Sequence, residues 1–201
     1  MSDSQPEETD TRREIQRLLD ERQPRMNALP GWVEPAMRLL PHVLITVTIL
    51  NLLIGLVAVI TPWLATWFGP SVTDPIYSFY ALICPQRPSH TWFINGHPMA
   101  FEQRDVAMYV GFGVAGLLYL VAPFMRRPLS GGGLVIGCAP LLIDVGLSTV
   151  GVVPSTWFSR LWTGSLASFV IVWWSYPRFD NYLERVRSHL VAVRSALRAQ
   201  T

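Results

Sequence analysis

The side chains best able to do chemistry are concentrated in residues 84–109, which read CPQRPSHTWFINGHPMAFEQRDVAMY. This motif stretch contains one thiol, two imidazoles, two guanidinium groups and two carboxylates, and long apolar stretches lie on both sides of it. Polar groups placed between membrane-crossing segments are the first place to look for a function. The candidate site residues of the motif stretch are Cys84, Gln86, Arg87, His90, His97, Glu102, Arg104, Asp105 and Tyr109.

Metal binding is one chemistry that this stretch could support. Its spacing matches no regular zinc pattern, and a single thiol mixed with imidazoles and carboxylates has no clear metal preference. We therefore favour hydrogen bonding within a structured loop over a metal site, and the sequence predicts no particular cofactor. The side chains that would have to supply the metal ligands are Cys84, His90, His97, Glu102 and Asp105.

One acidic residue, Asp144, lies within an otherwise uncharged apolar stretch. A carboxylate near the middle of a membrane costs ~2.5–3.5 kcal/mol on insertion scales, so we expect Asp144 to face other helices and to have a partner. Arg104 and Arg160 are the candidate partners, and Thr163 completes the polar set. An ion, proton or substrate site and a buried structural ion pair are both open interpretations.

The composition indicates an integral membrane protein rather than a soluble domain. Charged residues make up 15% of the chain, against about 25% in an average soluble protein, and hydrophobic residues make up 50%. The apolar residues form blocks, which predict an all-α integral membrane protein with four transmembrane helices in contact with the lipid bilayer. The expected spans are residues 43–68, 106–125, 132–153 and 161–177.

The segment between the first two spans, residues 69–105, is expected to form a structured outer loop. Within it, residues 76–83 are apolar but too few to cross a membrane, so they should lie at the interface or pack on the bundle. Prolines and the Asn95-Gly96 pair prevent one continuous helix in the motif stretch. Early in the second span, a stripe of small residues should let another helix approach closely. The stripe consists of Ala107, Gly111 and Ala115.

Both ends of the chain are polar. Residues 1–41 are expected to form a cytoplasmic segment with a helix at the membrane surface, and residues 42–177 to form the membrane domain. Residues 178–201 carry aliphatic side chains at steps of three and four, which predicts a cytoplasmic amphipathic helix. Asp180 could cap the start of that helix.

The distribution of arginine predicts how the chain is oriented. All 16 basic residues are arginines, and all but Arg87, Arg104 and Arg160 fall in the two polar ends or between the second and third spans. The positive-inside rule then places both termini in the cytoplasm and the motif stretch on the outer face of the inner or plasma membrane. A net charge of +2 is too small to indicate a nucleic-acid partner.

Two groups of residues carry a resemblance to a known family. The matching positions are Cys84, Gln86, Pro88, Gly96, Arg104, Tyr109 and Gly111, followed by Pro140, Asp144, Arg160, Thr163 and Gly164. With this spacing the chain resembles an uncharacterised prokaryotic family of multi-pass membrane proteins, catalogued as domain of unknown function 2085, over about residues 76–177. Because the family has no established activity, the resemblance implies a topology rather than a reaction.

The chain departs from the family motif at several positions. The family sequence begins Cys-His-Gln-x-Pro-x-Arg-Ser and later has two further cysteines. Here Pro85 stands for the His, His90-Thr91 for the Arg-Ser, Glu102 and Asp105 for the later cysteines, and Ala107 for the glycine after them. If the family site binds metal through Cys and His, this chain has lost most of those ligands.

The sequence contains no nucleophile or phosphate-loop motif, and the balance of features is against an enzyme. We expect an accessory or scaffold subunit of a larger membrane complex, such as an energy-transducing one, with other membrane subunits or a second copy as partners. Two alternatives stay open. One is an outer-face enzyme or metal-binding membrane protein, and the other is a small proton-coupled transporter that uses Asp144.

Overall fold

The computed structural model describes residues 35 and 38–198. The chain divides into two compact units, one comprising His42–Tyr182 and the other the residues outside that range. All of the candidate site residues belong to the first unit. Nearly all of residues 1–41, with the surface helix expected there, lie outside the described residues.

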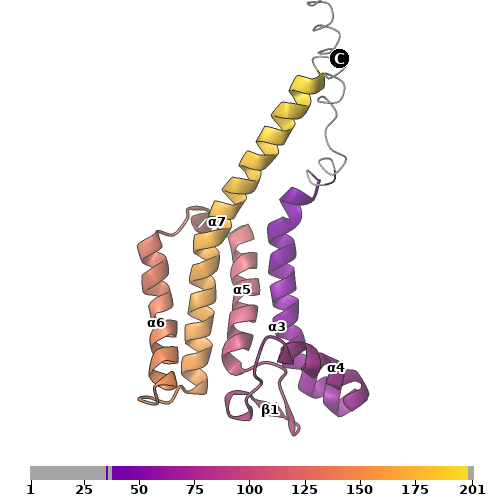
Figure 1. Cartoon of the computed structure of the whole chain (residues 1–201), viewed down its shortest axis with the longest axis vertical. Coiled ribbons are helices and arrows are strands. Elements are labelled where there is room, and N and C mark those ends of the chain that lie inside the picture. Colours follow the sequence, from indigo (N-terminus) through magenta and orange to yellow (C-terminus); the bar gives the residue numbers. More distant parts are fainter. Residues whose placement is uncertain (1–34, 36–37, 199–201) are drawn as a thin grey trace, which may run out of the picture. The chain divides into compact units, whose positions relative to one another are not determined.

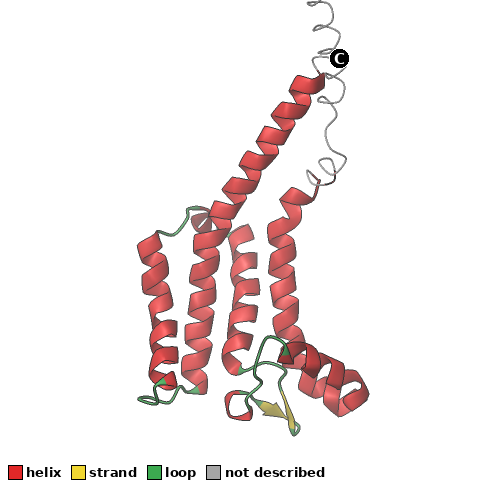
Figure 2. Cartoon of the chain, viewed as in Figure 1, coloured by secondary structure: helices red, strands yellow, loops and turns green. Residues whose placement is uncertain are grey.

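The described chain is almost entirely helical (Figures 1 and 2). Leu40–Phe68, Gln103–Val121 and Gly131–Thr149 are each long and apolar enough to cross a membrane, so the prediction of an all-α membrane protein is confirmed for three spans. The elements in order are η1 (Leu40–His42), α3 (Val43–Phe68), α4 (Pro70–Ala81), η2 (Pro88–His90), β1 (Phe93–Ile94), β2 (His97–Pro98), α5 (Gln103–Val121), η3 (Pro123–Arg126), α6 (Gly131–Thr149) and α7 (Trp157–Arg198).

Within the His42–Tyr182 unit, α5 lies between α3 and the first half of α7, and α6 lies on the far side of α7 (Figure 1). Small residues bring α3 and α5 together. A Cβ atom added to Gly116 would lie 2.3 Å from the Thr48 hydroxyl oxygen, and one added to Gly113 would lie 2.5 Å from Leu52 Cβ. Thr48 is fully buried and its hydroxyl is 3.1 Å from the Tyr176 hydroxyl of α7. The three helices therefore meet around one buried polar contact.

The small-residue stripe of α5 faces α7, which confirms that another helix approaches it closely. A Cβ atom added to Gly111 would lie 2.9 Å from Ser168 Cβ. The Ser168 hydroxyl is fully buried and donates hydrogen bonds to the carbonyl oxygens of Met108 at 3.0 Å and Gly164 at 2.7 Å. Ala115, further along the stripe, is 2% exposed.

The motif stretch folds over the end of α3 as a loop with a short hairpin. Phe93 pairs with Pro98 and Ile94 with His97, and the turn between them uses the positive φ of Asn95 (52°) and Gly96 (80°). This confirms that the motif stretch is not one continuous helix. The backbone N–H of Ala100 donates to the carbonyl of Ala58, which attaches the loop to α3.

Most of the apolar segment 76–83 belongs to a helix, α4, that ends at Ala81 and packs on α3. The Tyr80 hydroxyl donates to the Ile54 carbonyl at 2.5 Å, and the Tyr77 hydroxyl donates to the Pro98 carbonyl at 2.6 Å. The expected outer loop therefore contains a helix of 12 residues as well as the hairpin. Gly69, with φ of 73°, allows the chain to turn between α3 and α4.

The ends of the second and third spans differ from the predicted ones. The second span begins at Gln103 rather than residue 106 and ends at Val121, because Pro123 starts a separate 3-10 turn. The third span ends at Thr149 rather than residue 153, since Gly151 has a positive φ of 74° that stops the helix. The two C-terminal ends are set by a proline and a glycine, which a hydropathy pattern does not detect.

Residues 178–198 are helical, as predicted, but they continue α7 and do not form a separate helix that Asp180 could cap. Helix α7 is continuous from Trp157 to Arg198 and includes Pro177. Proline removes one backbone donor and usually bends or ends a helix, yet α7 continues past Pro177. The Arg178 guanidinium next to it donates to the Trp174 carbonyl and, at 2.8 Å, to the Leu129 carbonyl. The Asp180 carboxylate accepts a hydrogen bond from Tyr119 of α5 at 3.1 Å instead of capping a helix.

We predict that Gly116→Ala destabilises the protein by about 1–3 kcal/mol, because the new methyl group overlaps Thr48 in a packed helix interface. The apparent melting temperature in detergent measures this loss. Gly146→Ala in α6 is the matched control, since nothing lies within 4 Å of its added Cβ. Equal melting temperatures for the two variants would contradict close packing at the α3–α5 interface.

Candidate functional site

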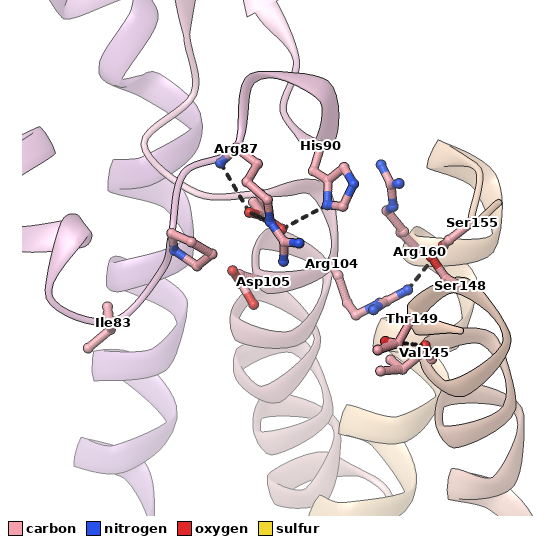
Figure 3. A pocket seen from close by; sticks show the side chains of 12 residues that line it. Ile83, Arg87, His90, Arg104, Asp105, Val145, Ser148, Thr149, Ser155 and Arg160 are labelled. Atoms are coloured by element: carbon pink, nitrogen blue, oxygen red, sulfur yellow. Dashed lines mark hydrogen bonds and ion pairs between the residues drawn. The ribbon is translucent and has the colours of Figure 1, made fainter. Parts of the chain in front are cut away.

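A cavity of about 500 Å³ lies at the end of the bundle where α5 begins and α6 ends (Figure 3). Its lining combines charged side chains and hydroxyl groups with a few apolar ones. The motif loop, α5, α6, α7 and the segment that joins α6 to α7 all contribute to it. The lining residues are Ile83, Pro85, Arg87, His90, Glu102, Arg104, Asp105, Val145, Ser148, Thr149, Ser155 and Arg160.

Four consecutive residues at the start of α5 direct side chains to different neighbours. Successive side chains on a helix are turned by about 100°, so a short polar run can reach several elements. Glu102, the residue before the helix, contacts the motif loop. Gln103 contacts α7, Arg104 contacts α6, and Asp105 contacts Cys84. The cavity is therefore built around the first turn of α5.

Glu102 attaches the part of the motif stretch before α5, called here the motif loop (residues 84–102), to the start of α5. One carboxylate oxygen accepts hydrogen bonds from the Arg87 backbone N–H at 3.1 Å and from Arg87 Nε at 3.0 Å, and the other lies 3.2 Å from His90 Nδ1. Burial raises the pKa of Glu102, but the hydrogen bonds and charge of Arg87, with the contact from His90, outweigh it and lower the pKa below its ordinary value. The carboxylate is therefore charged at neutral pH.

Asp144 pairs with Arg104, one of its two candidate partners. The Arg104 guanidinium donates to the Asp144 carboxylate and, at 3.1 Å, to the Ser155 hydroxyl. The Ser155 hydroxyl in turn donates to Asp144 at 2.8 Å. Because α6 ends at Thr149, Asp144 lies in the last turns of the helix.

The other candidate partner, Arg160, has a different environment. It is 8% exposed, and its guanidinium donates to the carboxamide oxygen of Gln103 at 3.0 Å. Among the described residues, no carboxylate forms an ion pair with it. Arg104 also keeps an unused donor, since its buried Nε has no hydrogen-bond partner in the described protein. Arg160 therefore lines the cavity without a direct ion pair among the described residues, and the ion-paired Arg104 still has one donor available.

Cys84 lies behind the cavity, not in its lining. It is 3% exposed, and its thiol hydrogen-bonds to the carboxylate of Asp105. Burial, followed by this hydrogen bond, raises the pKa of the Cys84 thiol to about 11. A thiol with so high a pKa is almost fully protonated at neutral pH and is a poor nucleophile.

Several sequence-predicted site residues lie away from the cavity lining. Gln86 donates to the carbonyls of Tyr77 at 3.0 Å and Ala100 at 2.9 Å, so it holds the loop backbone in place. Asp144 is also outside the lining, although its partner Arg104 belongs to it. The others lie on separate elements: His97 in β2, Tyr109 stacked on Phe101, and the buried Thr163 bonded to the Ser159 carbonyl.

The five proposed metal ligands do not form one cluster. In the described part of the chain, no three His, Cys, Asp or Glu side chains are placed to hold a metal ion together. Glu102 is engaged by Arg87 and His90, and Asp105 by Cys84. The arrangement is suited to binding a small polar molecule by hydrogen bonds and charge.

Sequence reasoning missed the hydroxyl groups and the carboxamide that complete the site. Ser148, Thr149 and Ser155 line the cavity, and Gln103 positions Arg160. One signal was present in the sequence. Ser and Thr three residues apart before an apolar run are typical of a helix start, and Thr156 and Ser159 exchange such capping bonds at 3.0–3.1 Å. That start brings Ser155 and Arg160 to the same end of α7.

The fold and the cavity define a helical membrane protein with a charged, hydrogen-bonding site at one end of its bundle. Residues 84–174 match the model of a family described as predicted membrane protein, DUF2085. The chain is also 30% identical, over 118 residues, to an uncharacterized protein of Methanocaldococcus jannaschii, a match that covers 56% of this chain and 73% of the relative. The chain belongs to the DUF2085 family. No solved structure matches it.

We predict that Glu102→Gln lowers stability by about 1–2 kcal/mol at pH 7, because it weakens the bonds to Arg87 and His90. A carboxyl group with a lowered folded-state pKa stabilises the fold above its ordinary pKa of about 4.3, and this contribution is lost as the pH falls through the folded-state value. The difference in melting temperature between wild type and variant should therefore shrink below about pH 4.3. Glu184→Gln, at an exposed position, is the control. A difference that stays constant from pH 7 to 3 would rule out this role for Glu102.

Proposed function

We propose that this chain is a four-span membrane protein that binds a small anionic molecule in the cavity at the outer end of its bundle. The observation that carries this proposal is the state of Arg160. Its guanidinium lines the cavity, is 8% exposed, and donates to a neutral carboxamide. A buried cation without a counter-charge is costly, and an anionic ligand would supply the missing charge.

Residues 161–177 of α7 are the proposed fourth span. They carry no charged side chain between Arg160 and Arg178. In this stretch Ser168 packs against α5, and Val170 lies within 2.6 Å of a Cβ added to Gly137 of α6. Three tryptophans and several hydroxyl residues make this segment less apolar than the other spans, which fits a helix that packs between two neighbours.

The sidedness of the cavity follows from the arginines at the two ends of the bundle. Trp173 and Arg178 of α7 donate to the carbonyls of Arg127 and Leu129, so these arginines share one end. Arg87, Arg104 and Arg160 line the cavity at the other. The arginine-rich end is cytoplasmic by the positive-inside rule, which places the cavity outside. Reporter fusions after Arg198 and within the motif hairpin should give cytoplasmic and outer-face signals respectively, and the reverse result would overturn this orientation.

The binding proposal is tested by isothermal titration calorimetry, in which ethyl phosphate is added to the purified full chain in detergent. We expect saturable binding by the wild type and at least about tenfold weaker binding by Arg160→Gln, because the charge-assisted bonds are lost. Gln103→Glu should weaken binding similarly, since the new carboxylate would form an ion pair with Arg160 while the guanidinium stays in place. Arg126→Gln, at an exposed position outside the cavity lining, is the control. The proposal would be refuted if the wild type bound neither soluble ethyl phosphate nor a co-purifying phospholipid, or if the control lost as much binding as Arg160→Gln.

A second candidate, an accessory or scaffold subunit of a larger membrane complex, is favoured by one observation on α6. This helix is apolar enough to cross a membrane, yet none of its residues is buried within the described structure. A helix that shares so little surface with its own bundle is available to pack on another membrane subunit or a second copy. Native mass spectrometry after extraction in mild detergent distinguishes the cases, because a chain found only as a monomer argues against this role.

A further inference from the structure

Among the described residues, two charged side chains that line the cavity form no direct ion pair. Arg87 and His90 contact Glu102, and Arg104 pairs with Asp144. In the part of the chain that the structure describes, neither Arg160 nor Asp105 forms an ion pair, although both line the same cavity. Arg160 bonds to the Gln103 carboxamide and Asp105 to the Cys84 thiol, and both of these partners are neutral groups.

These two groups lie on different helices and on opposite sides of the cavity. Asp105 belongs to the first turn of α5 and lies on the side of Ile83, whereas Arg160 belongs to α7 and lies beyond Arg104 (Figure 3). The separation prevents them from neutralising each other directly. It leaves one negative and one positive group facing a shared space of about 500 Å³, a volume within the range of pockets for small ligands.

We propose that the preferred ligand is a zwitterion, whose phosphate group lies at Arg160 and whose ammonium group lies at Asp105. This inference rests on the anionic-ligand function proposed above and adds a second, cationic subsite to it. An aminoalkyl phosphate has the required chemistry. Its phosphate oxygens can accept bonds from Arg160 and from the unused Nε donor of Arg104, because arginine and phosphate pair through several parallel bonds.

Such a group exists both as a free small molecule and as a phospholipid headgroup. The cavity rim favours access by either, since its polar interior is bordered by Ile83 and Val145, which are 52% and 36% exposed. Exposed apolar side chains at the cavity could contact lipid chains while the charged groups bind a headgroup. Both sources present a phosphoethanolamine group. The experiment must therefore distinguish binding of the soluble molecule from binding of the lipid headgroup.

The test compares three probes on the full chain in detergent: O-phosphoethanolamine, ethyl phosphate and ethanolamine. We expect phosphoethanolamine to bind about fivefold to tenfold more tightly than ethyl phosphate, because it gains the contact with Asp105. Asp105→Asn should abolish this preference, while its amide oxygen can still accept the Cys84 thiol bond. Asp74→Asn, at an exposed position in α4 that does not line the cavity, should keep the preference.

The lipid source is tested by mass spectrometry of phospholipids that stay bound to wild type and Asp105→Asn after purification. Retention of phosphatidylethanolamine by wild type alone, without binding of soluble phosphoethanolamine, would support the inference and identify the headgroup as the source. Equal binding of ethyl phosphate and phosphoethanolamine, with no selective lipid retention, would overturn the zwitterion inference and leave the anion site intact. Failure of every phosphate probe, soluble or lipid, would overturn the proposed function itself.

Discussion

The ion pair between Arg104 and Asp144 is the interaction on which the arrangement of the cavity depends. It joins the first turn of α5 to the last turns of α6, and Ser155 bonds to both partners from the segment before α7. A carboxylate in an apolar helix needs such compensation, because an unpaired charge in the membrane is expensive. Since Arg104 satisfies Asp144, Arg160 is left with Gln103 and, within the described residues, without a carboxylate. The pairing of Asp144 with Arg104 therefore also explains why Arg160 has no direct ion pair among the described residues.

Close packing of α5 against α3 and α7 fixes the position of the helix that carries Arg104. Gly111 and Gly116 let α5 approach α7 and α3 closely, at distances where even an added methyl group would overlap a neighbour. Buried hydroxyls at Thr48 and Ser168 cross-link the same interfaces by hydrogen bonds, which contribute in lipid as well as in water. Helix α6 has no buried residue in the described structure, although a Cβ added to its Gly137 would lie 2.6 Å from Val170 of α7. At the cavity end, Asp144 joins α6 to Arg104 of α5.

The sequence predicted the membrane-helical class, the three confirmed spans and the break in the motif stretch, because these depend on local hydropathy and on prolines. It also identified Asp144 with Arg104 and Arg160 as an interacting set. It could not choose between the two arginines, since that choice depends on the direction in which each residue of the first α5 turn points. The suggested capping role of Asp180 was also wrong, because no helix starts at that residue. Helix α7 continues through Pro177, although proline usually bends or ends a helix.

The central claim, that Asp144 is coupled to Arg104 and not to Arg160, is tested most directly by two double-mutant cycles. Asp144→Asn would be combined with Arg104→Gln in one cycle and with Arg160→Gln in the other, and the stability of each variant would be measured in the same detergent. The structure predicts a coupling energy of about 0.5–3 kcal/mol for Asp144 with Arg104 and additive effects for Asp144 with Arg160. Additivity in the first cycle, or stronger coupling in the second, would contradict the pairing of Asp144 with Arg104 and the cavity built around it.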